Sequence, residues 1–155
     1  MEILKELREE TGLSFAQIKK ALDEAGGDKE KAREILSQFS AASAEKKADR
    51  ELAAGVIAAY IHSNGTIGTM LELSCETDFV AKTDEFKALA HDLAMHATAM
   101  APTSVNNEDG LGEETALLAQ SFLKDPSMTV KQRLDAAVQK FGENTKVTRF
   151  VRYQM

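Results

Sequence analysis

The sequence predicts an α+β protein in which three short N-terminal helices precede a linker and a three-stranded antiparallel sheet packed with helices. Three observations lead to this fold class. Apolar residues recur every three or four positions in residues 1–40, which is the period of a helix. Two β-rich runs flank Asn64-Gly65, and a third closes the chain. We therefore expect a helical module at 1–40, a linker at 41–55 and a sheet-and-helix core subdomain at 56–155.

The helices of the N-terminal module are delimited by capping and turn residues. We expect the first to end near Gly12, the second to run from Ser14 to Gly26-Gly27, and the third to begin after Asp28. Their apolar stripes are Ile3, Leu4 and Leu7; Phe15, Ile18, Leu22 and Ala25; and Ala32, Ile35, Leu36 and Phe39. A bundle this small gains little stability from its own core, so we expect it to bind another molecule.

The segment from Ser40 to Gly55, SAASAEKKADRELAAG, is rich in alanine and charge and has no large apolar residue before Leu52. It has little to bury, so we interpret it as a solvated linker with helical tendency.

The core subdomain is expected to begin with a hairpin. Asn64-Gly65 favours the positive backbone angles of a tight turn between two strands. In the second strand one face would carry Ile67, Thr69, Leu71, Leu73 and Cys75 and the other Gly68, Met70, Glu72 and Ser74. This alternation predicts a mainly apolar face, which helices should cover, and a mixed one. The tail, NTKVTRFVRYQM, has strand composition and should complete the sheet.

Helices are expected between the hairpin and the tail. Thr83 should cap the best helix of the chain, which keeps its spacing until Pro102. A polar loop, TSVNNEDGLGEE, follows, and TALLAQSFL then predicts a short helix that Asp125-Pro126 ends. Thr129 should cap the last helix.

The composition excludes several classes of protein. Apolar residues make up 43% of the 155 residues and charged residues 28%, and the net charge is -6, which leaves no broad basic surface for phosphates. We therefore expect no direct nucleic-acid binding. No segment approaches the roughly 20 apolar residues of a membrane span and no signal-peptide pattern is present, so we expect a cytoplasmic protein without membrane contact. Cys75 is the only cysteine, which excludes an internal disulfide.

Residues that could carry catalysis or bind a metal are sparse. His91 and His96 are five positions apart, off the spacing that brings two ligands to one helix face, and His62 lies elsewhere. The chain has no phosphate-binding loop, dinucleotide fingerprint or nucleophile elbow. Carboxylates near Cys75 would raise the pKa of its thiol, whereas a nucleophile needs a lower one. We expect neither a cofactor nor an enzyme.

The most unusual feature is the segment SCETDFVAKTDEF, residues 74–86, which joins the second strand to the long helix. Asp78 and Phe79 stand side by side in it. In one interpretation Asp78 is an ordinary turn residue and Phe79 folds back under the sheet edge. In the other, Phe79 is an exposed anchor for a protein partner and Asp78 faces that partner's polar or cationic groups. The residues alone leave both interpretations open.

Three segments resemble a known family. LREETGLSFAQIKKALDEAGGDKEKA, CETDFVAKTDEF with LAMHATAMAP, and GENTKVTRFVRYQ are similar, in the same order, to signatures of bacterial elongation factor Ts, the guanine nucleotide exchange factor of elongation factor Tu. They span nearly the whole chain.

The resemblance implies a function and a set of contact residues. It implies that residues 1–40 form a ubiquitin-associated-like module that docks on the nucleotide-binding domain of Tu. The docking residues would be Leu13, Phe15 and Lys19. It also implies that the turn Thr77, Asp78, Phe79 and Val80 intrudes near the nucleotide and magnesium of Tu and speeds loss of GDP. His96 is a further candidate contact, although it is equally expected as an ordinary histidine on the helix surface. Magnesium and nucleotide would belong to Tu.

The chain departs from the family pattern in two places. The family commonly has Gly-Ala-Gly-Met-Met where this chain has Gly12-Leu13-Ser14-Phe15-Ala16, so Leu13 and Phe15 are expected to keep the apolar contact. Longer members have two core halves, whereas this chain has one and only a short segment between Pro102 and Thr129. Single-half members pair, and an exposed sheet edge in the tail would permit a homodimer here.

Two other classes of function remain as alternatives. An adaptor could bind a protein through the three-helix module alone, leaving the Asp78-Phe79 turn dispensable. A small thiol enzyme would depend on Cys75.

Overall fold

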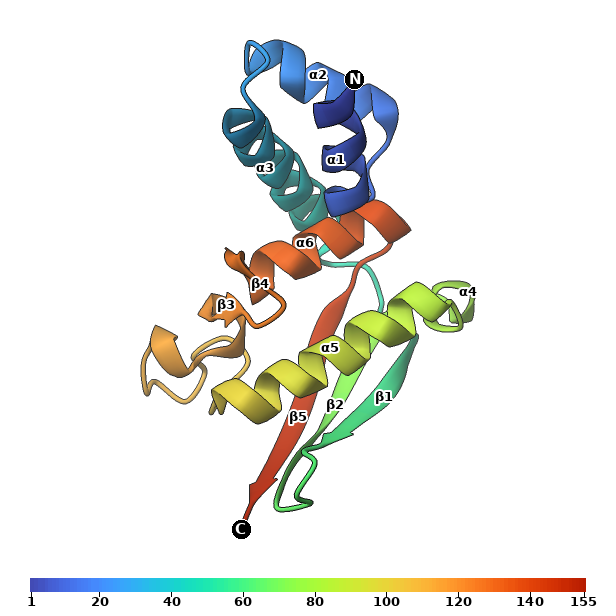
Figure 1. Cartoon of the computed structure of the whole chain (residues 1–155). Helices are drawn as coiled ribbons and strands as arrows, with labels where there is room; N and C mark the ends of the chain where they lie inside the picture. The colour runs from blue at the N-terminus through green and yellow to red at the C-terminus, as the bar shows by residue number, and fades with distance from the viewer.

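In the computed structural model, which describes residues 1–155, a helical module stands on a sheet-and-helix core (Figure 1). The module consists of α1 (Glu2–Thr11), α2 (Phe15–Glu24) and α3 (Lys29–Lys47). The core contains, in order, β1 (Ala54–Ile61), β2 (Ile67–Cys75), α4 (Asp78–Ala81), α5 (Asp84–Met100), the 3-10 turns η1 (Glu113–Thr115) and η2 (Leu117–Ala119), β3 (Ser121–Phe122), β4 (Asp125–Thr129), α6 (Val130–Phe141) and β5 (Lys146–Gln154). The predicted α+β class is confirmed.

The module's helices begin and end at the residues that local chemistry favours. Gly12 ends α1 with a φ of 67°, in the left-handed region that favours glycine. Ser14 and Gln17 form a capping box at the start of α2, and the Asp28 carboxylate accepts the Lys31 N–H at the start of α3. The module has its own buried cluster, formed by Leu7, Leu13, Ile18, Ala21, Ala25, Ala32 and Leu36.

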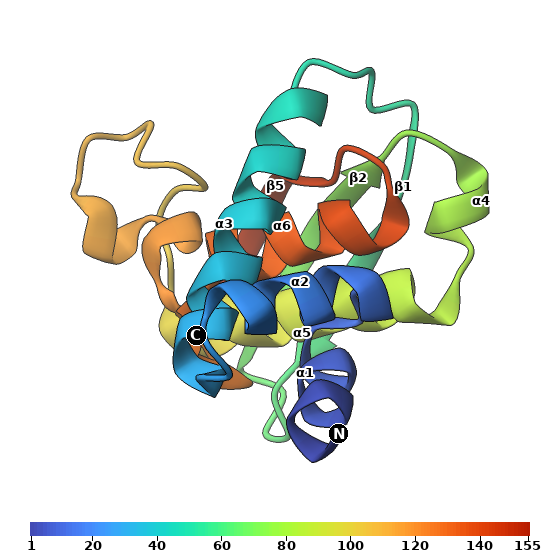
Figure 2. The ribbon, with the colours of Figure 1, turned by 90° about the horizontal axis from the view of Figure 1, so that it is seen from above.

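The third helix is longer than the sequence predicted. It continues past residue 40 to Lys47, into the segment expected as a linker, because that segment is rich in alanine and other helix-forming residues. It also packs against α6, where the Ser40 hydroxyl donates to Gln139 Oε1 at 2.5 Å. Figure 2, viewed from above, shows α3 lying across α6. The module therefore rests on the core through α3.

The core sheet has the predicted three antiparallel strands, in the order β1-β2-β5. The hairpin register runs from Ala54 opposite Cys75 to Ile61 opposite Gly68. Gly65 takes a φ of 74° in the turn, as the Asn64-Gly65 dipeptide predicts. The tail pairs with β2 along its whole length, with one irregularity between Glu72 and Leu73. Both outer edges, on β1 and β5, are unpaired.

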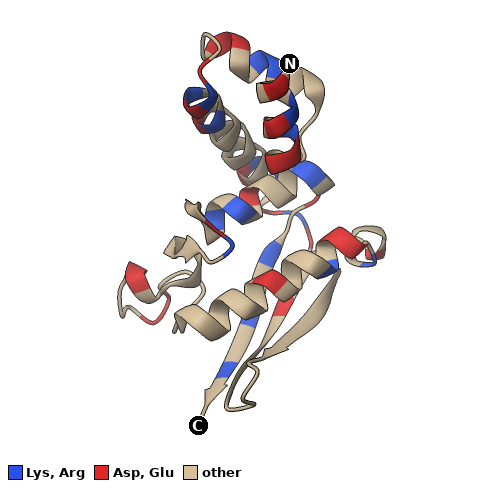
Figure 3. Cartoon of the chain, viewed as in Figure 1, with Lys and Arg blue, Asp and Glu red and all other residues tan.

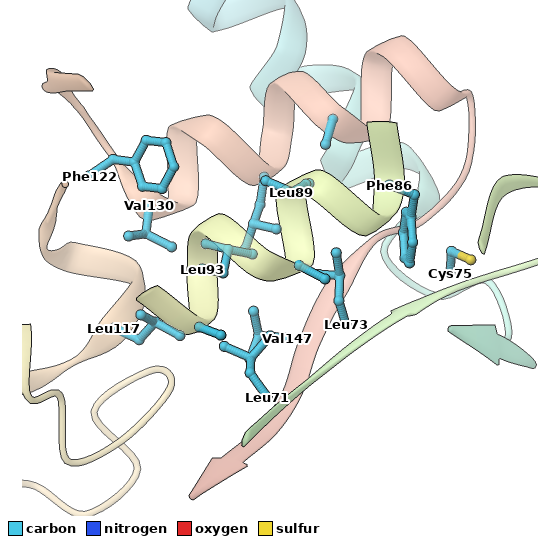
Figure 4. Close-up of a cluster of buried hydrophobic side chains, with 14 of the residues drawn as sticks. Leu71, Leu73, Cys75, Phe86, Leu89, Leu93, Leu117, Phe122, Val130 and Val147 are labelled. Atoms are coloured by element: carbon cyan, nitrogen blue, oxygen red, sulfur yellow. The ribbon is translucent and has the colours of Figure 1, made fainter. Parts of the chain in front are cut away.

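One face of the sheet is covered by α5, as the alternation in β2 predicted. Figure 4 shows apolar side chains from β2, β5, α5 and α6 meeting there, among them Leu71, Phe86, Leu89 and Val147. The opposite face carries exposed apolar residues on all three strands: Ile57, Ile61, Met70, Val151 and Tyr153. Charged residues gather on the helical module, whereas β1 has none (Figure 3).

The short helix predicted for residues 115–123 is wrong. This segment contains the last residue of η1, the whole of η2 and the first strand of a small β3-β4 hairpin. Its backbone is held by the preceding loop, because the N–H groups of Leu117 and Leu118 donate to the carbonyls of Ser104 and Val105. A short isolated helix has little stability of its own, so tertiary hydrogen bonds override the local pattern. No helix of the chain has the length and apolar character needed to span a membrane.

Candidate functional site

The Thr77–Val80 turn forms the start of α4, directly after β2 ends (Figure 1). Thr77 is the N-cap residue, and its hydroxyl accepts the Val80 N–H at 3.5 Å. Phe79 is 91% exposed, so it does not fold back under the sheet edge. Asp78 beside it is also exposed, and its carboxylate has no hydrogen-bond partner within the chain. The turn therefore presents an aromatic ring and an unpaired carboxylate together.

The residues that follow Phe79 are anchored in the core. Ala81 is buried in the main apolar cluster, and Val80 packs against it. The Thr83 hydroxyl, which caps α5, donates to the Val80 carbonyl at 2.8 Å. Exposing a large aromatic ring to water is unfavourable. The fixed backbone on both sides of Phe79 nevertheless keeps its ring exposed. A fixed, exposed aromatic residue is typical of a protein interface anchor.

A carboxylate from a distant part of the chain completes the turn. Glu143, between α6 and β5, accepts the Glu76 N–H at 3.1 Å and the Thr77 N–H at 3.0 Å through Oε1. Its Oε2 accepts the Thr77 hydroxyl at 2.6 Å. Sequence reasoning did not identify Glu143, because nothing in its local pattern indicates which backbone it will meet.

Asn144, the residue after Glu143, ties the Thr77–Val80 turn to the end of α3. The Asn144 N–H donates to Glu76 Oε2 at 2.6 Å, and its side-chain amide donates to the carbonyls of Ala48 and Arg50 at 3.3 and 2.9 Å. Arg50 also lies 3.6 Å from Glu76 as an ion pair. The segment after α3 and the Thr77–Val80 turn therefore share one loop as their support.

The predicted docking residues of the module lie at the start of α2. Phe15 is 51% exposed, and Lys19 is exposed four residues later, so both side chains lie on one face of the helix. Leu13, which was expected to contact a partner with them, is instead buried in the module's own cluster. Its side chain has almost no exposed area for a partner to contact.

His96 is fully buried and has no exposed surface for a partner to contact. Its Nδ1 accepts the Leu123 N–H at 3.0 Å, so Nε2 carries the proton and donates to Gln120 Oε1 at 3.0 Å. The Gln120 amide donates in turn to the carbonyls of Met100 and Glu114. Burial lowers the pKa of His96, which keeps the ring neutral. The ring therefore secures the β3-β4 hairpin to α5.

The thiol of Cys75 is buried beside Phe86 (Figure 4). Burial raises its pKa first, and the negative charge of Glu143 raises it further. The thiol also donates to the Thr77 carbonyl at 3.3 Å. This environment is the opposite of the one that activates a nucleophilic cysteine.

The other histidines form no cluster of metal ligands. The rings of His62 and His91 both lie near that of Tyr60, with centroid distances of 6.3 and 5.8 Å. Nowhere in the chain do three His, Cys, Asp or Glu side chains gather in a way that could hold a metal ion.

Comparison with known proteins identifies relatives along the full length of the chain. The sequence model of the family described as Elongation factor TS matches residues 13–110. A protein named elongation factor Ts from Thermotoga petrophila is 41% identical over 189 aligned positions, covering 100% of this chain and 95% of that protein. One from Carboxydothermus hydrogenoformans is 42% identical over 190 positions, covering 99% and 88%. One from Rubrobacter xylanophilus is 39% identical over 191 positions, covering 100% and 98%.

These alignments are longer than the 155 residues of this chain. The relatives therefore carry residues, within the aligned span, that this chain lacks.

Proposed function

The chain belongs to the elongation factor Ts family, and we propose that it is a guanine nucleotide exchange factor that promotes GDP release from elongation factor Tu during translation. The observation that carries this proposal is the exposure of Phe79 on a turn whose backbone is fixed from both sides. An exchange factor needs no covalent chemistry of its own. It needs a rigid surface that its partner accommodates only by loosening its nucleotide site.

In the proposed mechanism the Asp78-Phe79 turn inserts near the magnesium and nucleotide of Tu. Burying the Phe79 ring at the interface would supply about 1.5 to 3 kcal/mol of favourable transfer free energy. The unpaired Asp78 carboxylate would compete for polar groups and water around the magnesium. Because the turn is already ordered, little of this free energy is lost in ordering it on binding.

The direction of the cycle follows from linkage. If the chain binds nucleotide-free Tu more tightly than GDP-bound Tu, GDP must weaken the binding of the chain by the same factor. GTP can then complete the cycle by displacing the chain. Magnesium and nucleotide belong to Tu in this scheme, and the chain carries no cofactor.

The N-terminal module is the proposed docking element. Phe15 and Lys19 would contact Tu, and Leu13 would support that surface from within the module. We expect Phe15→Ala and Lys19→Ala to raise the concentration of the chain needed for half-maximal GDP release. The rate at saturation should stay unchanged, because neither residue belongs to the turn. A lower rate at saturation with unchanged affinity would contradict this division of roles.

The module also favours a second candidate, an adaptor that binds a protein partner without promoting exchange. Phe15 and Lys19 form an exposed apolar and basic pair on α2, separate from the turn. For an adaptor, binding would persist while Asp78 and Phe79 were dispensable.

Stopped-flow release of a fluorescent GDP analogue from Tu tests the main proposal. We expect the wild-type chain to accelerate release, and Phe79→Ala or Asp78→Ala to reduce the acceleration at least tenfold, about 1.4 kcal/mol of coupling. Leu111→Ala is the matched control, since Leu111 is exposed in the loop that follows the C-terminal end of α5, whereas α4 precedes its N-terminal end (Figure 1). Binding to Tu without faster GDP release would favour the adaptor instead.

The uncovered face of the sheet supports a homodimer. Exposed apolar residues on β1, β2 and β5 form this face, and both edge strands are unpaired. A second copy could cover it symmetrically, since the same residues would lie on both sides of the interface. We propose that pairing of this kind supplies the second core half that longer family members have within one chain.

A further inference from the structure

The backbone at the end of β2 requires hydrogen-bond acceptors that the sheet does not supply. The β1 pairing ends at Cys75 and the β5 pairing ends at Ser74, so the N–H groups of Glu76 and Thr77 have no strand partner. The Glu143 carboxylate accepts both, at 3.1 and 3.0 Å. Hydrogen bonds to an ionised acceptor are stronger than those between neutral groups. Glu143 therefore holds the chain at the point where it leaves the sheet and enters the turn.

The same carboxylate orients the residue that caps α4. The Thr77 hydroxyl donates to Glu143 Oε2 at 2.6 Å, so its hydrogen points away from α4 and a lone pair is left to accept the Val80 N–H. With only four residues, α4 cannot be stable as an isolated helix. The direction in which Phe79 projects must therefore be set by tertiary contacts. Glu143 supplies them at the start of the helix, and the buried Ala81 supplies them at its end.

From this geometry we infer that Glu143 is a positioning residue for the Thr77–Val80 turn, through which the chain is proposed to promote exchange. No contact between Glu143 and Tu is proposed. Glu143 acts only through Thr77 and the backbone that precedes Thr77. The inference rests on the proposed function, since it assigns to Glu143 the conformation in which Phe79 and Asp78 meet Tu. Glu143 lies 66 positions from Thr77 along the chain, and the loop after α6 brings it there.

The test compares two substitutions at Glu143 in the GDP-release assay. Glu143→Ala removes all three hydrogen bonds, and we expect it to reduce the acceleration of release at least tenfold. Glu143→Gln removes the same charge but keeps an amide oxygen that can accept the two N–H groups, and we expect it to stay within about threefold of wild type. If Gln and Ala lose equally while the Glu76 and Thr77 amides of Glu143→Gln stay as protected from exchange as in the wild-type chain, the charge acts on Tu directly and the positioning role is overturned.

Two controls separate positioning from general effects. Glu85→Ala removes a carboxylate from the first turn of α5, where it pairs with Lys140 and touches neither Glu76 nor Thr77, so we expect wild-type release. In the Phe79→Ala background, adding Glu143→Ala should cause a smaller further loss than it causes in the wild-type chain, since the ring that Glu143 positions is already absent. Losses that multiply would show that Glu143 acts by another route.

Amide hydrogen exchange on the free chain tests the same inference without Tu. Glu143→Ala should speed exchange at Glu76, Thr77 and Val80 while the middle of α5 stays protected. Unchanged protection at those three amides would overturn the inference even if GDP release fell. If the wild-type chain fails to accelerate release, the proposed function fails, and exchange at these amides still decides whether Glu143 holds the turn.

Discussion

The side-chain amide of Asn144 donates to the Arg50 carbonyl at 2.9 Å, which joins the loop before β5 to the segment that follows α3. The same amide donates to the Ala48 carbonyl at 3.3 Å, and Lys146 Nζ donates to that carbonyl at 2.9 Å. The exit from the helical module is thus attached to the loop that also supports the Thr77–Val80 turn. This arrangement holds the two proposed Tu contacts on one framework.

Asn144→Ala should lower the free energy of unfolding by about 1 to 3 kcal/mol, because Asn144 is buried and its loss leaves the Arg50 carbonyl without a partner. Urea unfolding measures this loss. Asn106→Ala is the matched control, since Asn106 is exposed and its side chain makes no hydrogen bond. We also expect faster amide exchange at residues 48–53. Equal stability of the two variants would contradict the assigned role.

Two phenylalanines seven positions apart should separate stability from exchange activity. Phe86 is buried and its ring meets that of Phe141 edge to face, so Phe86→Ala should cost about 3 to 5 kcal/mol of unfolding free energy. Phe79→Ala should change that free energy by less than about 0.5 kcal/mol, because the ring is exposed. Thermal or urea unfolding of both variants gives the comparison. A large stability loss in Phe79→Ala would mean that its effect on GDP release is indirect.

The stability of the fold should fall in mild acid because of His96. Burial holds its pKa below the ordinary value of 6.5 in the folded chain, while the unfolded chain titrates normally. Between the lowered pKa and 6.5 the unfolded chain binds a proton that the folded chain does not. The stability that neutral His96 contributes is therefore fully present above pH 6.5 and is lost as the pH falls through the lowered pKa. Protonation at Nδ1 would also remove the acceptor of the Leu123 N–H.

Unfolding of the wild-type chain and of His96→Gln, measured at pH about 7 and about 5.5, isolates this contribution from those of the carboxylates. We expect the variant to be less stable at the higher pH and to lose less on acidification. Parallel losses in the two proteins would assign the acid sensitivity to other groups.

The proposed homodimer depends on the uncovered sheet face. Tyr153 is 74% exposed there, with Val151 and Met70 beside it in the register of β5 and β2. Tyr153→Lys should place a charge in the interface and shift the chain to monomer in sedimentation velocity. Gln154→Lys adds the same charge one residue further along β5 and should leave the dimer intact. A wild-type chain that is monomeric at high micromolar concentration would exclude pairing through this face.

Several elements of the fold could be predicted from residues close together in the sequence. Ser14 and Thr129 cap their helices with partners three residues away, and Gly65 adopts the turn angle that its lack of a side chain allows. The alternation in β2 correctly indicated which face the long helix covers. These interactions act within a few residues, so the local pattern contains all the groups involved.

Local sequence patterns were enough to predict the order and type of most elements and to single out the Asp78-Phe79 pair. Only the tertiary structure decided that residues 115–123 are not a helix, that Leu13 and His96 are buried, and that Phe79 is exposed. For the turn, for His96 and for residues 115–123 the physical reason is the same. The groups that decide these outcomes, such as Glu143 for the turn and Gln120 for His96, lie far away in the chain and meet their partners only when the fold brings them together.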